Sequence, residues 1–295
     1  MYTSDFFQYL QVEKRSSIHT LRAYVSDLTQ FSEFISDQFQ INSPIEALSI
    51  HVRSWVSWLI EHKNSTRSVN RKLTCLRTYY KFCIRNGYTD NNPMNKVITP
   101  RCSKRLPWFI EEKNINNLFS EIDFGDGFIG CRDKAILETF YGTGMRLSEL
   151  MNLKEDNINF HNNTMKVLGK RNKERIIPFG NTMKNTINDY QEIKQEAFEN
   201  IEHSKYLFIN TKGMQLNSKN IYLIVRKYLS KITTISQRSP HVLRHTYATH
   251  LLNNGAELNS IKEILGHANL SATQIYTHTT INKLKSTYKQ AHPRA

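Results

Sequence analysis

A short run rich in proline and basic residues, residues 91–107, interrupts the chain. It reads Asn-Asn-Pro, Thr-Pro-Arg and then Ser-Lys-Arg-Leu-Pro, so three prolines fall within it. Proline lacks a backbone N–H and favours an extended conformation in the residue before it, so the run is typical of a linker. A chain of 295 residues is long enough to bury two hydrophobic cores. We therefore predict an N-terminal domain over residues 1–92, a linker over 93–107 and a C-terminal domain over 108–295.

The net charge of the chain is +14, from 40 Lys and Arg against 26 Asp and Glu. A surplus of this size favours a polyanionic partner, most commonly nucleic acid, although a basic protein kept soluble by its charge is the alternative. Residues 1–100 hold 12 basic and 8 acidic residues, and the rest of the chain holds 28 and 18. Because both halves are basic, the charge suits two domains that clamp one polyanion.

Cysteine usage and hydropathy favour a cytoplasmic protein. Cys75, Cys83, Cys102 and Cys131 form no CxxC pair and no close cluster, so we expect buried, reduced thiols rather than disulfides or a zinc site. The first residues lack the basic start and apolar core of a signal peptide. No stretch approaches the roughly 18 apolar residues that span a bilayer, so we expect no membrane partner.

The N-terminal domain is predicted to be helical. Apolar residues from Leu21 to Ile35 recur at helical spacing, which indicates an amphipathic helix with one buried face. A second helix is expected over residues 66–86, and Gly87 is well placed to end it. The apolar side chains of this second helix fall on one face: Val69, Leu73, Leu76, Tyr80 and Ile84.

The opposite face of this second helix is strongly basic. No acidic residue occurs between Glu61 and Asp90, although exposed helices normally interleave both signs of charge because like charges repel. We interpret the face as a phosphate-binding surface, and a merely solvated face is the alternative. The candidate DNA-binding residues of this domain are Arg67, Arg71, Arg77, Lys81 and Arg85.

The C-terminal domain is predicted to be mainly helical, with one β-hairpin. Residues 164–168 and 175–179 have strand-like sequences, and the polar run 169–174 between them is expected to form the turn. Pro178 suggests an edge strand, because proline cannot donate a hydrogen bond to a neighbouring strand. The tip carries cations that can approach a phosphate or simply maintain solubility: Lys170, Arg171, Lys173 and Arg175.

Two segments combine an arginine with a predicted helix start. In GTGMRLSEL, two glycines permit a tight turn, so Arg146 lies where backbone N–H groups also favour an anion. In PHVLRH, Pro240 suits a first helical turn, and His241, Arg244 and His245 share one face. The two histidines could bind zinc, but the glutamate of HExxH is missing and an arginine would repel the metal. We therefore prefer phosphate handling to a metal site.

A fourth segment, LGHANLSATQIYTH, surrounds one of the 14 tyrosines of the chain. Ser271 and Gln274 form a capping-box pattern, which predicts a helix that starts at Ser271. Tyr276 then falls within the second turn, and His267 lies just before the helix. Only the neighbouring motifs distinguish Tyr276 from an ordinary core or surface tyrosine.

Taken together, these segments resemble the tyrosine recombinases, and within that family the bacterial Xer recombinases. The resemblance rests on GTGMRLSEL, GKRNKER, HVLRHTYATHLL, LGHANLSATQIYTH and the terminal HPRA, with TLRAY and KRLP in the N-terminal half. It covers essentially the whole chain, and no catalytic position is missing. It implies a mainly α fold, in which a helical, SAM-like core-binding domain and an α-rich catalytic domain with a small β-hairpin or sheet form a C-shaped DNA clamp.

The resemblance also implies roles for individual residues. Arg146 and Arg244 would hold the scissile phosphate, and Tyr276 would attack the phosphorus to form a 3′-phosphotyrosyl link. His241 would be the base candidate, His267 would support the phosphate and the nucleophile, and Lys170 would protonate the leaving 5′-oxygen. Lys173 would contact a DNA groove, although the two lysines could exchange roles. No metal and no cofactor is implied, because the covalent link conserves the energy of the broken bond and no GxxxxGK[ST] motif occurs.

Family members act as tetramers on two DNA sites and exchange strands through a Holliday junction. We therefore expect as partners a double-stranded recombination site, other copies of this chain or a paralogous recombinase, and a DNA translocase or other activator. The expected process is the resolution of chromosome dimers at a dif-like site before cell division. Ile281, Leu284 and Tyr288 lie at helical spacing and would dock on a neighbouring subunit, with packing on their own domain as the alternative.

Four alternative functions stay open. An integrase or transposase of a mobile element uses the same chemistry, and neighbouring phage or conjugation genes would favour it. A type IB topoisomerase shares the active-site logic but needs no specific site. A non-catalytic DNA-binding protein on the same fold would not need Tyr276. A zinc hydrolase built on His241, His245 and His267 is the most distant alternative, and metal analysis would test it.

Overall fold

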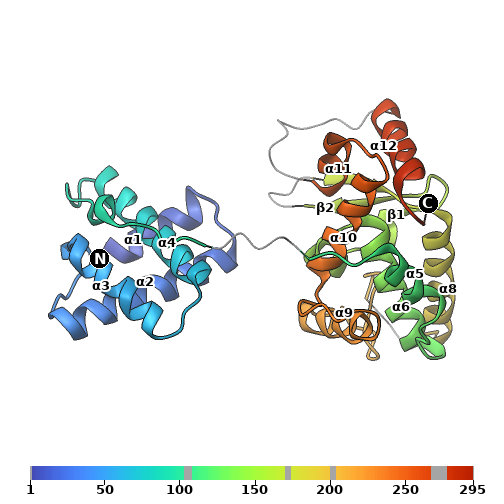
Figure 1. The fold of residues 1–295 in the computed structure, drawn as a ribbon, viewed down its shortest axis with the longest axis horizontal. Coiled ribbons are helices and arrows are strands. Elements are labelled where there is room, and N and C mark those ends of the chain that lie inside the picture. Colours follow the sequence, from blue (N-terminus) through green and yellow to red (C-terminus); the bar gives the residue numbers. More distant parts are fainter. Residues whose placement is uncertain (1, 103–107, 170–173, 200–203, 267–277, 295) are drawn as a thin grey trace. The chain divides into compact units, whose positions relative to one another are not determined.

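The structure, a computed structural model, describes residues 2–102, 108–169, 174–199, 204–266 and 278–294. The chain divides into two compact units, Met1–Arg105 and Leu106–Ala295 (Figure 1). Each unit buries a hydrophobic core of its own. None of the helices in the described ranges has the length and apolar composition that a membrane span requires.

The first unit is built from helices (Figure 1), whose buried side chains form one core. Ser17 and Ser65 precede the two longest helices, and each accepts a hydrogen bond from a backbone N–H three residues on, which satisfies a free donor at the helix start. In the core, the rings of Phe31 and Trp55 lie 5.0 Å apart. The elements are α1 (Tyr2–Val12), α2 (Ile18–Phe39), η1 (Pro44–Glu46), α3 (Ser49–Glu61), α4 (Thr66–Arg85) and η2 (Pro93–Lys96).

Both helices predicted for this unit are present. The first amphipathic run lies in α2, and the helix expected over residues 66–86 is α4, which is followed by Gly87 in a left-handed conformation. The spacing put Ile84 on the apolar face of α4, but its side chain is exposed. The buried face continues from Tyr80 to Cys83, three residues on, so Ile84 turns to solvent.

The beginning of the predicted linker, residues 93–107, folds together with the first unit. Residues 93–96 form η2, which lies against α3 and α4. Met94 and Val97 are buried in the core of the unit. The extended run that the prolines predict is therefore shorter than expected, because these two apolar side chains gain burial before the chain leaves the core.

All four cysteines are free thiols, but they are not all buried. Cys75 and Cys83 lie in the core and Cys131 is half-buried. Cys102 is exposed, although its Sγ accepts a hydrogen bond from Nδ2 of Asn70 at 3.3 Å. The expectation of burial is therefore wrong for Cys102. Burial raises the pKa of the Cys75 thiol to about 12, so this thiol stays protonated at neutral pH.

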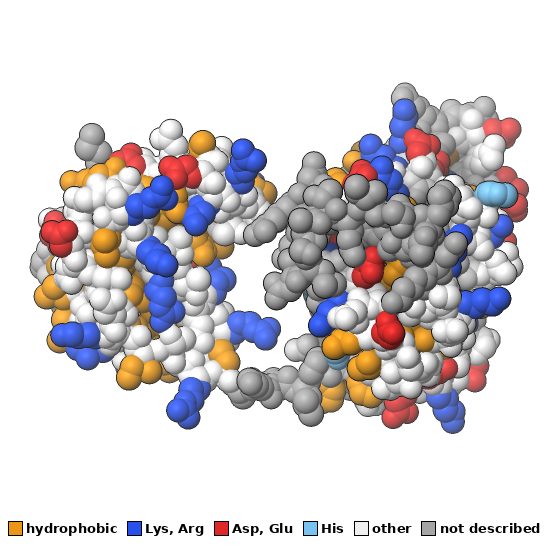
Figure 2. All heavy atoms as spheres, turned by 90° about the horizontal axis from the view of Figure 1, so that it is seen from above, with side chains coloured by type: hydrophobic (Ala, Val, Ile, Leu, Met, Phe, Trp, Pro, Cys, Tyr) orange, Lys and Arg blue, Asp and Glu red, His pale blue; other side chains and the backbone are white. Residues whose placement is uncertain are grey.

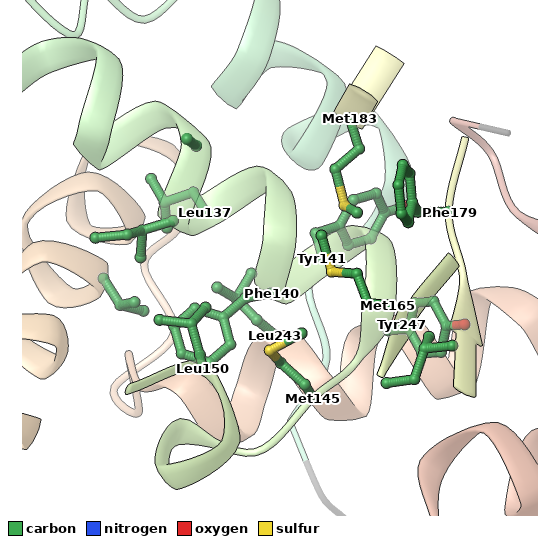
Figure 3. Packing of buried hydrophobic residues seen from close by; sticks show 14 of the residues in the cluster. Leu137, Phe140, Tyr141, Met145, Leu150, Met165, Phe179, Met183, Leu243 and Tyr247 are labelled. Carbon is green, nitrogen blue, oxygen red and sulfur yellow. The ribbon is translucent and has the colours of Figure 1, made fainter. Parts of the chain in front are cut away.

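The second unit is also mainly helical and is organised around α6, whose C-terminal half is almost entirely buried. Figure 3 shows Phe140 and Tyr141 of this helix among side chains from other elements, including Leu243 and Tyr247. The elements are α5 (Glu112–Ser120), α6 (Gly127–Thr143), α7 (Leu147–Met151), η3 (Glu155–Asn157), β1 (Ile158–Asn159), β2 (Thr164–Leu168), β3 (Glu174–Pro178), α8 (Asn181–Ala197), α9 (Ser218–Ile232), α10 (Pro240–Asn253), α11 (Leu258–Leu265) and α12 (His278–Ala291).

The predicted hairpin is present as β2 and β3, which pair antiparallel with Thr164 opposite Pro178 and Leu168 opposite Glu174. The short strand β1 extends the sheet beyond the hairpin, in the order β1-β2-β3. Pro178 therefore lies on an edge strand, as predicted. The expected turn, residues 169–174, lies mostly outside the described residues, so the position of its tip stays a prediction.

The C-terminal helix α12 packs on its own unit, against α10, α11 and β3. Leu284 and Tyr288 are buried there, and the side chain of Ile281 lies outside the described residues. Beyond the helix, Arg294 forms a two-point ion pair with the buried carboxylate of Glu138. The structure thus shows the alternative that the sequence left open, and this apolar face is not available to a neighbouring subunit in this conformation.

Candidate active site

The two arginines that the motifs singled out lie side by side in the second unit. Arg244 comes from the first turns of α10, which begins at Pro240 as predicted. Its guanidinium donates to the carbonyl oxygens of Gly144, at 2.6 Å, and Leu265, at 2.7 Å. Arg146 immediately precedes α7, and its Nη2 donates to the carbonyl oxygen of Gly266 at 2.9 Å. Because Leu265 and Gly266 are consecutive, both guanidinium groups meet the same short stretch of backbone.

The proximity of like charges also appears in the electrostatics of the site. Burial, together with the positive charges of Arg146 and Arg175, lowers the pKa of Arg244 to about 10. The group is therefore still charged at neutral pH. A cation held in this way gains free energy when an anion approaches, because the anion offsets both the desolvation and the repulsion.

A glycine permits the close approach of α6, α10 and α11 at this site. Gly144 caps α6 with φ +58°, a left-handed conformation that L side chains rarely adopt. A Cβ at this position would lie 2.5 Å from the ring of Tyr247 and 2.9 Å from the side chain of Leu265. The second glycine of the GTG motif is therefore required both for the turn and for the contact between its carbonyl and Arg244.

Glu149 is a residue of the site that the sequence analysis missed. It is 5% exposed, and its carboxylate accepts hydrogen bonds from the backbone N–H and the Nη1 of Arg146, both at 2.7 Å. Burial alone would raise its pKa, but hydrogen bonds and charge from Arg175, and then from Arg146, hold the pKa at about 2. Glu149 is therefore ionised at neutral pH. The available signal was the glutamate three residues after Arg146 at a helix start, which is a capping position.

Arg175 is buried rather than exposed at the hairpin tip. Only 4% of the residue is exposed, which corrects its grouping with the tip cations. It lies on β3 opposite Val167, and alternate residues of this strand, Arg175 and Ile177, face the interior. Its guanidinium donates to both oxygens of Glu149 at 2.8 Å, and its Nε donates to the carbonyl oxygen of Ile264, also at 2.8 Å.

Three consecutive carbonyls at the end of α11 thus each accept a hydrogen bond from a different arginine. Ile264 pairs with Arg175, Leu265 with Arg244 and Gly266 with Arg146. The last carbonyls of a helix have no partner within the helix and carry partial negative charge, so cations are favoured there. The C-terminus of α11 therefore holds all three guanidinium groups in one place.

The candidate histidines are partly described. His241 is exposed on the first turn of α10, one turn before Arg244. His245 is half-buried, and burial lowers its pKa, so it is neutral at neutral pH. No cluster of three metal-ligating side chains occurs among the described residues, but His267 lies outside them, so the zinc alternative is not tested.

Three candidate catalytic residues, Lys170, His267 and Tyr276, lie outside the described part of the chain, and so does the DNA-binding candidate Lys173. Their roles stay predictions. The structure does describe the residues that flank them in the sequence, since Leu168 and Glu174 are the last pair of the hairpin and Gly266 precedes His267. Of the six predicted catalytic residues, the structure therefore places Arg146, His241 and Arg244.

The candidate DNA-binding residues of the first unit differ in their surroundings. Arg67 and Lys81 are exposed on α4, and Figure 2 shows many Lys and Arg side chains over one face of this unit. Arg71 pairs with the buried carboxylate of Asp27, which Lys72 also contacts at 3.1 Å. Arg77 is half-buried, and its guanidinium donates a hydrogen bond to the hydroxyl of Thr99. Arg85 is exposed, and its Nη1 lies 3.8 Å from Oε2 of Glu13. The basic face is thus partly neutralised by acids that lie elsewhere in the sequence.

This arrangement can bind a phosphate through Arg146 and Arg244. A guanidinium has five N–H groups, and the described contacts use two of the five in each of these arginines. The remaining donors suit the paired hydrogen bonds that arginine makes to phosphate oxygens. Since Glu149 is shared with Arg175, the group of three arginines and one carboxylate keeps a positive charge.

The sequence of the chain matches known protein families in both units. Residues 109–283 match the phage integrase family, and residues 4–87 match the phage integrase N-terminal SAM-like domain. The tyrosine recombinase XerC of Oceanobacillus iheyensis is 38% identical over 297 residues, which cover 100% of this chain and 97% of the relative. The tyrosine recombinase XerC of Bacillus subtilis is 37% identical, with 98% of this chain and 95% of the relative covered.

Solved structures share the fold. The XerH site-specific recombinase bound to a palindromic difH substrate, in a post-cleavage complex, matches with a TM-score of 0.73 and 18% identity, over 98% of this chain and 81% of that one. A lambda integrase dimer bound to a COC′ core site matches with a TM-score of 0.68 and 16% identity, over 93% and 98%. With the matches in sequence, these likenesses show that the chain belongs to the phage integrase family, as a tyrosine recombinase of the Xer type.

Proposed function

We propose that this recombinase cleaves and rejoins DNA through Tyr276, with Arg146 and Arg244 holding the scissile phosphate. The observation that carries the proposal is the placement of both guanidinium groups on the consecutive carbonyls of Leu265 and Gly266. Two adjacent cations with free donors would bind both non-bridging oxygens and stabilise the charge that develops in the pentavalent transition state. Binding of DNA alone would not require this buried and costly concentration of like charge.

In the proposed reaction, the phenolic oxygen of Tyr276 attacks the phosphorus and the bond to the 5′-oxygen breaks. The products are a 3′-phosphotyrosyl link and a free 5′-hydroxyl, so the number of phosphoester bonds is unchanged and rejoining needs no ATP. A phenol with a pKa of about 10 is ionised to roughly one part in a thousand at pH 7, so a base must assist it. His241 is the base candidate, His267 supports the phosphate, and Lys170 gives its proton to the leaving oxygen.

The exposed cations of the first unit and Lys173 would bind DNA around the cleaved bond. In this proposal, Arg67, Lys81 and Arg85 contact phosphates, which sets affinity and salt dependence but not the recognised sequence. Arg71 and Arg77 have partners within the unit and would contribute less. No metal ion and no cofactor takes part in the proposed chemistry.

We further propose that the process is the resolution of chromosome dimers at a dif-like site, within the cytoplasm. Several relatives that cover nearly the whole chain are named XerC, and the solved XerH complex contains a difH substrate. A lambda integrase with this fold was solved as a tetramer on a Holliday junction, with a TM-score of 0.67. By analogy, a tetramer of this chain, alone or with a paralogous recombinase and an activating translocase, would exchange strands in pairs.

Integration of a mobile element is the second candidate. The integrase of transposon Tn1549, in complex with transposon right end DNA, has the same fold, with a TM-score of 0.69. The fold therefore serves both processes, and the DNA substrate distinguishes them. The supporting result for dimer resolution is recombination between two chromosomal dif-like sites, whereas recombination only between element ends and a target would support integration.

The experiment that tests the chemistry uses a nicked suicide substrate that carries the candidate site. Purified protein is incubated with it in EDTA, beside a Tyr276→Phe variant, and denaturing gels are used to detect a covalent adduct. We expect an adduct with the wild type alone. An adduct that persists in the Phe variant would show that the nucleophile is another residue, and an adduct that needs added metal would contradict the metal-free reaction.

A further inference from the structure

We propose that Arg175 is a positioning residue, which holds the guanidinium of Arg146 in its phosphate-binding orientation through the shared carboxylate of Glu149. The inference rests on the proposed function of Arg146 and goes beyond it, because Arg175 itself contacts neither DNA nor the reacting atoms. It also links strand β3 to the centre of the site.

The contact geometry fixes the carboxylate in one orientation. Oε1 of Glu149 accepts from Nη1 of Arg175 at 2.8 Å and from Nη1 of Arg146 at 2.7 Å. Oε2 accepts from Nη2 of Arg175 at 2.8 Å and from the backbone N–H of Arg146 at 2.7 Å. Each oxygen is thus shared by both arginines. Rotation of the carboxylate would break the planar two-point pair with Arg175, so the orientation of Arg146 depends on that pair.

Arg175 is itself fixed from the other side. Its Nε donates to the carbonyl oxygen of Ile264, and the backbone of Gly266 lies so close that a Cβ there would meet Cδ of Arg175 at 3.0 Å. All three nitrogens of the guanidinium are therefore engaged, and the residue is 4% exposed. A phosphate cannot reach it directly. Any effect of Arg175 on the reaction must pass through the groups that it holds.

The charge balance gives this contact a chemical consequence. With Arg175 absent, Glu149 and Arg146 would form a closed pair with no net charge, because one carboxylate would neutralise one guanidinium. With Arg175 present, the carboxylate is shared and the group keeps one positive charge, to which Arg244 adds a second. Arg175 thus leaves Arg146 both oriented and electrostatically available to a developing negative charge.

The test compares Arg175→Met with the wild type in single-turnover cleavage of two suicide substrates. One carries the normal phosphate, and the other carries a methylphosphonate at the scissile position, which removes one anionic oxygen and the charge. On the phosphate we expect the variant to cleave roughly 100-fold more slowly, the size of effect seen when one stabilising donor is lost. On the methylphosphonate we expect the variant and the wild type to differ by less than about 3-fold, since the oxygen that requires Arg146 is missing.

A defect of equal size on both substrates would overturn the proposal, because a purely structural role would slow both reactions alike. Arg175→Lys serves as a second variant in case the Met variant does not fold. It keeps the charge but cannot make the two-point pair with Glu149. We therefore expect the Lys variant to cleave the phosphate substrate about 10-fold more slowly than the wild type, and the methylphosphonate substrate at the wild-type rate. Equal loss with lysine on both substrates would again contradict the inference.

Arg132 offers a matched control within the same unit. It is buried, donates through Nε and Nη2 to Asp133 at 3.1 and 2.8 Å, and lies about 18 Å from Gly144 along α6. Arg132→Met should lower the melting temperature as Arg175→Met does, but leave the ratio of the two cleavage rates unchanged. If the proposed function itself is wrong, the wild type will form no adduct that depends on Tyr276, which is a separate outcome from an unchanged ratio in Arg175→Met.

Discussion

At the scale of single residues, the carboxylate of Glu149 neutralises charge on two arginines at once, so its charge matters more than its size. Glu149→Gln keeps the shape but directs an amide N–H₂ group toward guanidinium donors. We expect a loss of about 3 kcal/mol in the free energy of unfolding, the cost of removing one partner from a buried ion pair. Urea unfolding measures it, with Glu121→Gln on the exposed end of α5 as a control that should change stability by less than about 0.5 kcal/mol.

Gly144 provides a second prediction at this scale. Gly144→Ala combines the strain of a positive φ with a clash against the buried ring of Tyr247, so we expect a loss of about 2 kcal/mol or more in unfolding free energy. Gly87→Ala is the matched control, because Gly87 also has a positive φ but has no atom within 4 Å of its Cβ position. It should show the conformational cost alone, about 1 kcal/mol. Equal losses in the two variants would mean that the packing around Tyr247 adjusts freely.

Sequence reasoning identified the arginines of the site and missed the groups that hold them. Arg146 and Arg244 were evident because each lies at a recognisable helix start. Arg175 resembled a hairpin-tip cation, since the strand alternation that turns it inward depends on a register that the sequence does not specify. The acceptors of Ile264, Leu265 and Gly266 are backbone carbonyls, which have no side-chain signature at all.

At the scale of elements, α4 shows how a basic face in the sequence differs from one in the structure. Lys81 is exposed without an acidic neighbour among the described contacts, whereas Arg71 is paired with Asp27. If Lys81 contacts a phosphate, Lys81→Ala should reduce the slope of log K against log salt by about 0.9 for binding to the DNA site. Fluorescence anisotropy over a range of salt concentrations measures the slope. An unchanged slope would remove Lys81 from the DNA interface.

Arg71→Ala should behave differently from Lys81→Ala. It leaves the buried carboxylate of Asp27 with Lys72 as its remaining described cation, so the first unit should lose about 1 kcal/mol of stability. The slope with salt should change by less than it does in Lys81→Ala. Thermal unfolding followed by circular dichroism separates the two effects, and a full change of slope without loss of stability would show that Arg71 leaves Asp27 to bind DNA.

The residues after α12 predict a dependence on pH. Burial, together with the positive charges of Arg294 and His250, lowers the pKa of His292 from 6.5 to about 3. Below pH 6.5 the unfolded chain binds a proton there that the native state does not bind. The contribution of His292 to the free energy of unfolding should therefore be fully present above pH 6.5. As the pH falls from 6.5 toward 3, this contribution should decrease by about 1.4 kcal/mol per pH unit. Urea unfolding at a series of pH values gives the free energy of unfolding as a function of pH, and His292→Gln should make this dependence less steep. If the free energies of the two proteins change with pH in parallel, the prediction is wrong.

At the scale of the whole molecule, the two hydrophobic cores share no residue. The proline run predicted a division near this place, and helical spacing or a helix-start signal predicted α2, α4, α10 and α12. The long helices α3, α6, α8 and α9 were not predicted from the sequence. The sequence could not show that Met94 and Val97 return to the first core, because such contacts depend on tertiary packing. It also gave no sign of β1, which is only two residues long.

Because each core is complete in itself, residues 1–102 and 108–295 should fold as separate proteins. We expect each fragment to unfold in urea with one cooperative transition, at the midpoint that its unit shows within the intact chain. Tryptophan fluorescence reports mainly on the first unit, since Trp55 and Trp58 lie there, and far-ultraviolet circular dichroism reports on both. A fragment that stays unfolded alone would show that the units stabilise each other.

The three carbonyls at the end of α11 have a consequence for how the site tolerates sequence change. Any amino acid offers the same carbonyl, so most substitutions in Leu258–Leu265 that keep the helix should leave the arginines supported. A deletion or insertion of one residue in this helix would instead place a different carbonyl opposite each arginine. It would also rotate the chain that follows by about 100°. Gly266 does depend on its identity, because its φ is +64° and a Cβ there would lie 3.0 Å from Cδ of Arg175, and Ile264 and Leu265 depend on theirs through burial in the core. In this stretch the spacing of the backbone, more than the choice of side chains, specifies the site.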